Sequence, residues 1–170
     1  MKKSRIHLIF VSIISLLLLL SGCGEKVVSL KTVIDNEEPI MQNLQGMERK
    51  TLKRSWGEPV ASTESYDLWE SDGKFVQAWY EDDISTSVHR SCTMRVKVLE
   101  VSGNTALTEP EEGQWERNSA DRIFIPLSAL YSDVPASLSW GDILEIEYDG
   151  MIMETYPAQI HEPYSIKLVH

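Results

Sequence analysis

Acidic side chains occupy most of the positions at which this sequence could do chemistry. Glu145, Glu147 and Asp149 alternate along one segment, so an extended chain would place their carboxylates on the same face. Carboxylate oxygens are the ligands that hard cations prefer. However, residues two apart in a strand are separated by about 6.8 Å, which is too far for all three to reach one ion without bending. We therefore interpret them as a solvated strand face that resists edge pairing.

The other chemical candidates are isolated. His89, His161 and His170 are far apart in the sequence, so a zinc site would need three separate segments to converge. The acidic run 81–83 is interpreted as a charged loop, with calcium binding as an alternative. The sequence contains no GxSxG elbow, Walker loop, GxGxxG fingerprint, HExxH or EF-hand loop. We expect no metal and no cofactor, and we assign no catalytic residue.

Aromatic side chains are the second group that could recognise a partner. The chain has 5 Trp and 6 Tyr, more than a small core needs at alternate positions. Exposed tyrosine and tryptophan are favoured anchors of protein contacts. If Trp69 and Trp79 face each other across a hairpin, one aromatic face would pack on helices while Tyr66 or Tyr80 faces solvent. The alternative is that the rings simply pack the cores. The candidate binding residues are Trp115, Trp140, Tyr148 and Tyr156.

The N-terminal segment has the features of an export signal. Basic residues within 2–5 precede an apolar stretch over 6–20, which is shorter than the roughly 20 residues needed to cross a bilayer. The stretch ends in Leu20-Ser21-Gly22-Cys23, which resembles the lipobox of bacterial lipoproteins. The resemblance implies cleavage before Cys23 and a diacylglyceryl group on its sulfur. We therefore expect a signal peptide over 1–22 and a lipid anchor that holds the protein on the extracytoplasmic side of the cell membrane.

Removal of this signal would leave one cysteine and an acidic chain. Cys92 would have no disulfide partner, and we interpret it as a small apolar residue. The whole chain has a net charge of −10, and the part after the basic signal is more acidic still. Such a surface repels phosphate polyanions, which excludes nucleic acid as a partner. Anionic lipids would repel it too, so attachment depends on the acyl chains.

The mature chain divides into a tether and two folded parts. Residues 23–36 are the expected tether, and residues 37–83 the first folded part. Short helices are predicted over 37–44 and 47–56, the second ended by Gly57 and Pro59.

An Asp72-Gly73 pair between two runs of aromatic and β-branched residues, 66–70 and 74–80, predicts a hairpin. The first part is therefore an α-α-β-β module. The polar segment 82–92 lacks periodicity, and we place the boundary between the two parts there.

Residues 92–170 have the pattern of a small β domain. Apolar residues change parity between Val98 and Leu99, which predicts a β-bulge. Short strands separated by turns favour a small antiparallel OB-like β-barrel and an α+β fold class for the whole chain. The strands are expected over 94–101, 105–109, 123–127, 144–148 and 164–168.

Both parts have family resemblances. Through Trp56-Gly57-Glu58-Pro59 and the hairpin ending in Trp79-Tyr80-Glu81-Asp82, the first part resembles the lipoprotein modules of the BamE (SmpA/OmlA) and β-lactamase-inhibitor-like class. That resemblance implies two helices packed on an antiparallel sheet. Through the stretches 140–150 and 151–160, the second part resembles the small β-barrel domain of uncharacterised lipoproteins from Gram-positive-type bacteria. Neither resemblance implies a reaction.

Together these features predict a non-enzymatic, lipid-anchored envelope protein. It would bind another protein or an envelope ligand through its barrel loops and hairpin face. One alternative is a cell-envelope enzyme of unrecognised type that uses Asp121, Glu145 or Glu154 as an acid or base. The other alternative is a cation sensor that uses the acidic loops.

Overall fold

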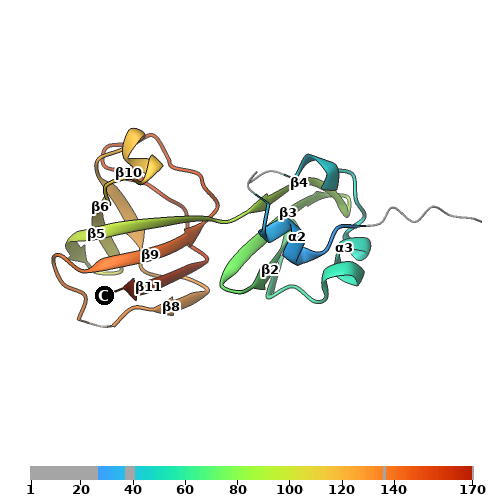
Figure 1. The fold of residues 1–170 in the computed structure, drawn as a ribbon, viewed down its shortest axis with the longest axis horizontal. Helices are drawn as coiled ribbons and strands as arrows, with labels where there is room; N and C mark the ends of the chain where they lie inside the picture. The colour runs from blue at the N-terminus through green and yellow to red at the C-terminus, as the bar shows by residue number, and fades with distance from the viewer. Residues whose placement is uncertain (1–26, 37–40, 136, 170) are drawn as a thin grey trace, which may run out of the picture.

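The protein is built mainly of β-strands, which form two sheets. The computed structural model describes residues 27–36, 41–135 and 137–169. The two sheets lie side by side along the longest axis of the molecule (Figure 1). They are joined where strand β4 (Ile84–Arg90) passes through Ser91 into strand β5 (Cys92–Ser102). This β-rich architecture with few helices fits the α+β class.

The first sheet contains the predicted hairpin. Its antiparallel order is β1-β2-β3-β4, with β1 at Ala61–Ser62, β2 at Tyr66–Ser71 and β3 at Lys74–Glu81. Strands β2 and β3 pair across Asp72 and Gly73, both of which have positive φ angles. Aspartate and glycine tolerate this backbone region, which a two-residue hairpin turn requires. The predicted hairpin is confirmed.

The segment 82–92, in which we placed the boundary between the two parts, contains a strand that the sequence pattern did not predict. Most of that segment is strand β4, which pairs with β3 across a second hairpin turn at Asp82 and Asp83. The inward face of β4 carries Ser85 as well as Val88, and both are buried. The Ser85 hydroxyl donates to the Leu44 carbonyl at 2.6 Å. A hydrogen-bonded serine can occupy a core position, and this hides the apolar alternation that normally reveals a strand.

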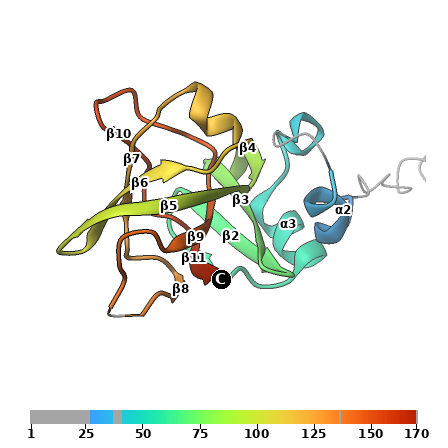
Figure 2. The same ribbon diagram turned by 60° about the vertical axis from the view of Figure 1, so that its left-hand side comes forward.

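Helical segments cover one face of this sheet (Figure 2). They are α2 (Leu30–Ile34), a single turn of 3-10 helix η1 (Gln42–Leu44) and α3 (Arg49–Trp56). Helix α3 lies within the range expected for the second helix. Of the range 37–44, residues 37–40 lie outside the described residues. Val33 of α2 is buried against the sheet, so the end of the segment that we expected to be a tether is part of the core.

The second sheet has the order β10-β7-β6-β5-β9-β11-β8. Its strands beyond β5 are β6 (Thr105–Pro110), β7 (Ile123–Pro126), β8 (Tyr131–Asp133), β9 (Ile143–Tyr148), β10 (Ala158–Gln159) and β11 (Ser165–Val169). The short strands β8 and β10 were not predicted from the sequence. The register of β5 against β6 shifts between Val98 and Glu100, which confirms the predicted bulge.

No ladder among the described residues closes this sheet into a barrel, because β8 and β10 stand at its two ends. The described strands of the expected OB-like barrel therefore do not form a closed barrel. Residues 127–130 have no strand pairing, and Pro126 lacks an amide hydrogen to continue the ladder. Inward-facing aliphatic side chains such as Val96, Ile125 and Ile146 fill the core behind the sheet.

Candidate functional site

The β2–β3 hairpin has two different faces, and this difference creates the candidate site. Cross-strand partners share a face, and Trp69 pairs with Val76 whereas Tyr66 pairs with Trp79. Trp69 packs into the core beneath the helices. Trp69 and Trp79 therefore do not share an aromatic face, in contrast to the arrangement considered from the sequence. Trp79 and Tyr66 lie on the other face, which is turned toward the second sheet.

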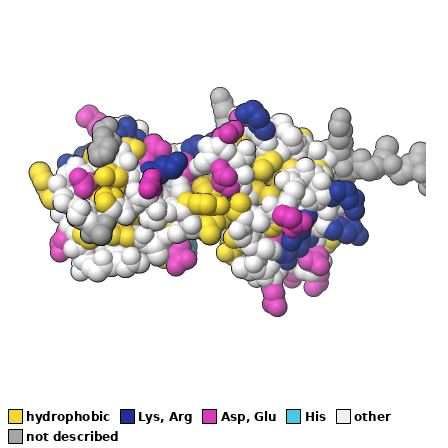
Figure 3. Space-filling model, turned by 90° about the horizontal axis from the view of Figure 1, so that it is seen from below, with side chains coloured by type: hydrophobic (Ala, Val, Ile, Leu, Met, Phe, Trp, Pro, Cys, Tyr) yellow, Lys and Arg dark blue, Asp and Glu magenta, His cyan; other side chains and the backbone are white. Residues whose placement is uncertain are grey.

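A cleft of about 710 Å³ lies between this face of the hairpin and loops of the second sheet. This volume falls within the usual range for ligand sites. Figure 3, which views the molecule from below, shows hydrophobic side chains gathered where the two parts meet. The cleft is lined by Ala61, Tyr66, Leu68, Gln77, Trp79, Ser128, Ala129, Leu130, Asp149, Met151, His161, Glu162, Pro163 and Tyr164.

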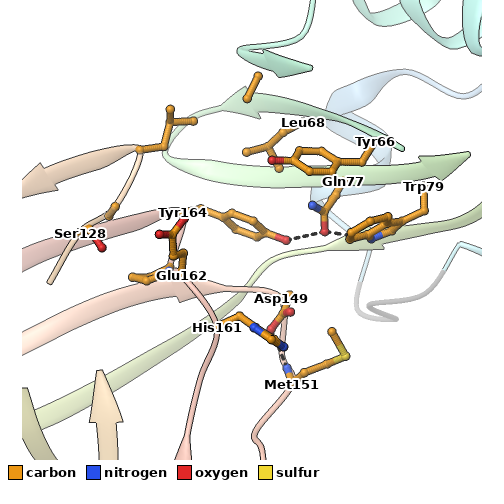
Figure 4. A pocket seen from close by; sticks show the side chains of 14 residues that line it. Tyr66, Leu68, Gln77, Trp79, Ser128, Asp149, Met151, His161, Glu162 and Tyr164 are labelled. Atoms are coloured by element: carbon orange, nitrogen blue, oxygen red, sulfur yellow. Dashed lines mark hydrogen bonds between the residues drawn. The ribbon is translucent and has the colours of Figure 1, made fainter. Parts of the chain in front are cut away.

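The hairpin wall of the cleft is an aromatic platform held by a shared acceptor. The rings of Tyr66 and Trp79 lie with their centroids 5.2 Å apart, tilted by 55°. The Trp79 indole N–H donates to Gln77 Oε1 at 3.1 Å, and the Tyr164 hydroxyl donates to the same oxygen at 2.9 Å. Gln77 is therefore the group that fixes the Trp79 ring and links it to the second sheet (Figure 4).

The opposite wall carries the polar and charged groups. Figure 4 shows Asp149, Met151 and His161 across the cleft from Gln77 and Trp79. Asp149 Oδ1 accepts the Met151 N–H at 2.9 Å, which holds the carboxylate in place at the end of β9. No lysine or arginine is present among the residues that line the cleft. The cleft thus combines an aromatic and apolar lining with two carboxylates, those of Asp149 and Glu162, and one imidazole, that of His161.

A buried ionic network fixes the two walls relative to each other. Glu147 of β9 accepts hydrogen bonds from Lys74 of β3 at 2.5 Å, from Ser91 at 2.6 Å and from Thr93 at 2.6 Å. Glu147 is buried, so its interpretation as part of a solvated strand face is wrong. A buried carboxylate is tolerated because three donors replace its water. The network lies at the junction of the sheets, so the cleft is preformed.

Aromatic packing reinforces the same junction. The Phe75 ring, on the hairpin face that carries Trp79, lies 5.4 Å from the Tyr164 ring and 5.7 Å from the Tyr131 ring, centroid to centroid. Phe75 is almost completely buried. Edge-on and tilted aromatic pairs at these distances are favourable beyond their area burial. Residues from β3, β8 and the start of β11 therefore pack as one unit.

The four aromatic residues expected to bind a partner do not form one surface. Trp140 and Tyr156 are 76% and 81% exposed, Trp115 is 50% exposed, and Tyr148 is 1% exposed. Trp115 and Tyr156 line a second hollow, of about 840 Å³, together with Met153. None of the four lines the cleft between the sheets.

Tyr148 belongs to the core of the second sheet. Its hydroxyl donates to Glu116 Oε1 at 2.9 Å. Burial raises the pKa of Glu116 above its ordinary value, outweighing hydrogen bonds that lower it. This pair therefore anchors the short 3-10 helix η2 (Trp115–Asn118) to β9. Its role is structural.

The carboxylates proposed for catalysis are dispersed. Asp121 and Glu154 are exposed, and Glu145 lies in the middle of β9 opposite Arg95 of β5. The part of the chain that the structure describes contains no group of three or more His, Cys, Asp or Glu side chains placed to hold a metal ion. The acidic run 81–83 makes the β3–β4 turn, and Asp83 faces Arg49 at 3.7 Å.

Cys23 lies outside the described residues. Among the residues that are described, no helix is both long and apolar enough to cross a membrane. Cys92 is a free cysteine packed against the core of the second sheet, and burial raises the pKa of its thiol.

Tyr66 and Trp79 were candidates from the sequence, whereas Gln77, Met151 and His161 were not expected to belong to one site. The alternation of Phe75, Gln77 and Trp79 along β3 is visible in the sequence and marks one face of the hairpin. The loops of the second sheet that cover that face lie far away in the chain, so the sequence of the hairpin does not reveal them.

Comparison with known proteins found no family model, no curated protein and no solved structure that matches this chain.

Proposed function

We propose that this protein is a lipid-anchored, extracytoplasmic binding protein that holds an envelope component in the cleft between its two sheets. The observation that carries the proposal is the cleft itself. It is concave, lined by aromatic and polar groups, and fixed by the buried Glu147 network. A rigid site of this kind binds without first having to order its walls.

We also propose a fold type for each of the two parts. The helices packed on β1–β4 support a BamE-like α-α-β-β module that is extended by β4. The order of β7, β6, β5, β9 and β11 supports an opened OB-like barrel. Strand β8 follows β7 closely in the chain and pairs parallel with β11, as the third strand of an OB fold pairs with the fifth.

The proposed anchor is tested by metabolic labelling. Cells that express the protein are grown with a fatty-acid precursor, and we expect the wild-type chain to incorporate the label. Cys23→Ala should incorporate none and should leave the membrane fraction, because two acyl chains provide stable anchoring and loss of both removes it. Cys92→Ala is the matched control and should be labelled like the wild type. Equal membrane retention of Cys23→Ala, together with an unlabelled wild type, would contradict the anchor.

The binding site is tested by crosslinking in cells. A photoreactive phenylalanine derivative is placed at Leu130, which lines the cleft and is exposed, or at Val101, which is exposed on the β5–β6 hairpin. We expect a discrete crosslinked product from position 130 and none from position 101. The product should weaken when Trp79→Ala is added, because the indole is part of the platform. The same products from both positions would show that the cleft is not the binding site.

A further inference from the structure

The charge of the cleft restricts what it can bind. Its lining includes the carboxylates of Asp149 and Glu162, the imidazole of His161, and no lysine or arginine. The protein around it is acidic, with a net charge of −10 over the chain. An anionic ligand would therefore be repelled both at long range and inside the cleft. A cationic ligand would be attracted both at long range and inside the cleft.

The position of Asp149 makes this attraction specific. One of its oxygens, Oδ1, accepts the Met151 N–H. The other, Oδ2, has no hydrogen-bond partner among the described residues. The carboxylate thus has an acceptor available and lies across the cleft from Gln77 and Trp79 (Figure 4).

The wall opposite Asp149 is aromatic and apolar, and it suits the remaining surface of an organic cation. The Trp79 indole and the Tyr66 phenol line this wall as a tilted pair, and the Trp79 side chain is exposed. The negative face of an aromatic ring attracts an ammonium group, and indole is the best of the aromatic side chains for this purpose. Leu68, Leu130 and Met151 supply apolar surface for an aliphatic stem. A bare metal ion would find too few oxygen ligands here and would gain nothing from the apolar wall.

We propose that the cleft binds an organic ammonium group on an aliphatic stem, between Trp79 and Tyr66 on one wall and Asp149 on the other. This inference rests on the proposed function and identifies the ligand class of the same site. The ammonium group can belong to a small quaternary amine or to a lysine side chain of a partner, and the test separates the two sources.

The test follows the indole N–H signal of Trp79 by NMR. The full-length protein, purified in a neutral maltoside detergent, is titrated with choline or with Nα-acetyl-lysine methylamide. The matched neutral probes are 3,3-dimethylbutan-1-ol and Nα-acetyl-norleucine methylamide, which have similar shapes and no charge. We expect a saturable shift of the Trp79 signal with at least one ammonium probe and no saturable shift with its neutral match. Saturation by choline alone identifies a small quaternary amine, and saturation by the lysine probe alone identifies a side chain.

The variants assign the effect to the cleft. Asp149→Asn keeps the shape of the side chain and removes its charge, and it should weaken binding of the ammonium probe by about tenfold. Glu145→Gln removes a carboxylate of β9 that lies four positions before Asp149 and outside the cleft, and it should leave binding unchanged. Unaltered signals from the other indoles show that each variant is folded.

Two results would overturn the inference: saturation by neutral and charged probes alike, or no saturable shift with either ammonium probe. Neither result affects the crosslinking experiment at Leu130, which tests the proposed function independently. Conversely, absence of a crosslink at Leu130 combined with choline binding would count against a cellular partner at the cleft and leave the ligand chemistry in place.

Discussion

Asp67→Ala is expected to lower the free energy of unfolding by about 3–5 kcal/mol, the usual cost of removing one partner from a buried ion pair. Asp67 is completely buried, and the side chain of Arg49 is 15% exposed. Arg49 donates to both carboxylate oxygens, from Nη2 to Oδ1 at 2.6 Å and from Nε to Oδ2 at 3.0 Å. Without the carboxylate, the largely buried guanidinium charge loses its bidentate partner.

The rest of the network explains why the loss cannot be absorbed locally. Arg49 of α3 also donates to the backbone carbonyls of Thr63 and Glu64 in the loop between β1 and β2. Its guanidinium lies over the Tyr80 ring, 4.8 Å from the centroid. The cation therefore ties the helix to the loop and to β3, and each of these contacts depends on its position against Asp67.

Chemical denaturation measures this effect. Asp35→Ala is the matched control, because it also removes an aspartate from an ion pair, with Lys31, but both of those side chains are largely exposed. We expect the denaturation midpoint of Asp35→Ala to equal that of the wild type. A midpoint for Asp67→Ala that matches the control would show that the buried pair contributes no net stability.

Asp67 also makes the free energy of unfolding sensitive to acid. Burial by itself would raise the pKa of Asp67, but hydrogen bonds from Arg49 and Ser62 and the charges of Arg49 and Lys53 outweigh it and lower the pKa. The unfolded chain then binds the proton more readily than the folded chain. The stabilisation is fully present above the unfolded value of about 3.9 and is lost as the pH falls through the lowered folded value. Stability of Asp67→Ala should consequently fall less steeply with acid than that of the wild type.

Glu147→Ala is the second substitution with a large expected effect, about 2–4 kcal/mol of unfolding free energy. It removes the acceptor of three hydrogen bonds at the junction between the sheets. Lys74 remains partly exposed and can recover some hydration, so we expect a smaller loss than for Asp67→Ala. The buried Ser91 hydroxyl cannot recover hydration, because it is enclosed between the sheets.

The effect of Glu147→Ala can also be followed through the NMR signal of the Trp79 indole. Because this residue links β9 to β3, its loss should loosen one part of the protein against the other and broaden the Trp79 indole signal on the cleft wall. Glu145→Gln, on the same strand but outside this network, is the control and should change neither stability nor the indole signal. A stable Glu147→Ala protein with an unchanged Trp79 signal would show that the ionic network does not hold the cleft.

Sequence predictions succeeded where neighbouring residues in the chain determine the local structure, and they failed where a contact with a distant residue determines it. The Asp72-Gly73 turn and the bulge between Val98 and Glu100 were predicted because turn chemistry and apolar parity are local. Strand β4 was missed because Ser85 occupies a core position through a hydrogen bond to Leu44, which is distant in sequence. The burial of Tyr148 was missed because its acceptor, Glu116, lies in a separate element.

The sequence by itself determined the acidic character of the chain and most of its strands, and it predicts an export signal that ends in a lipobox-like stretch at Cys23. These features follow from composition and from contacts between residues close together in the chain. Only the tertiary structure decided which faces meet and where a cleft forms. The hydrogen bond from Tyr164 to Gln77 joins residues far apart in the chain and closes one wall of the site. Contacts of this kind arise from the packing of one sheet against another, and no local pattern of residue types encodes them.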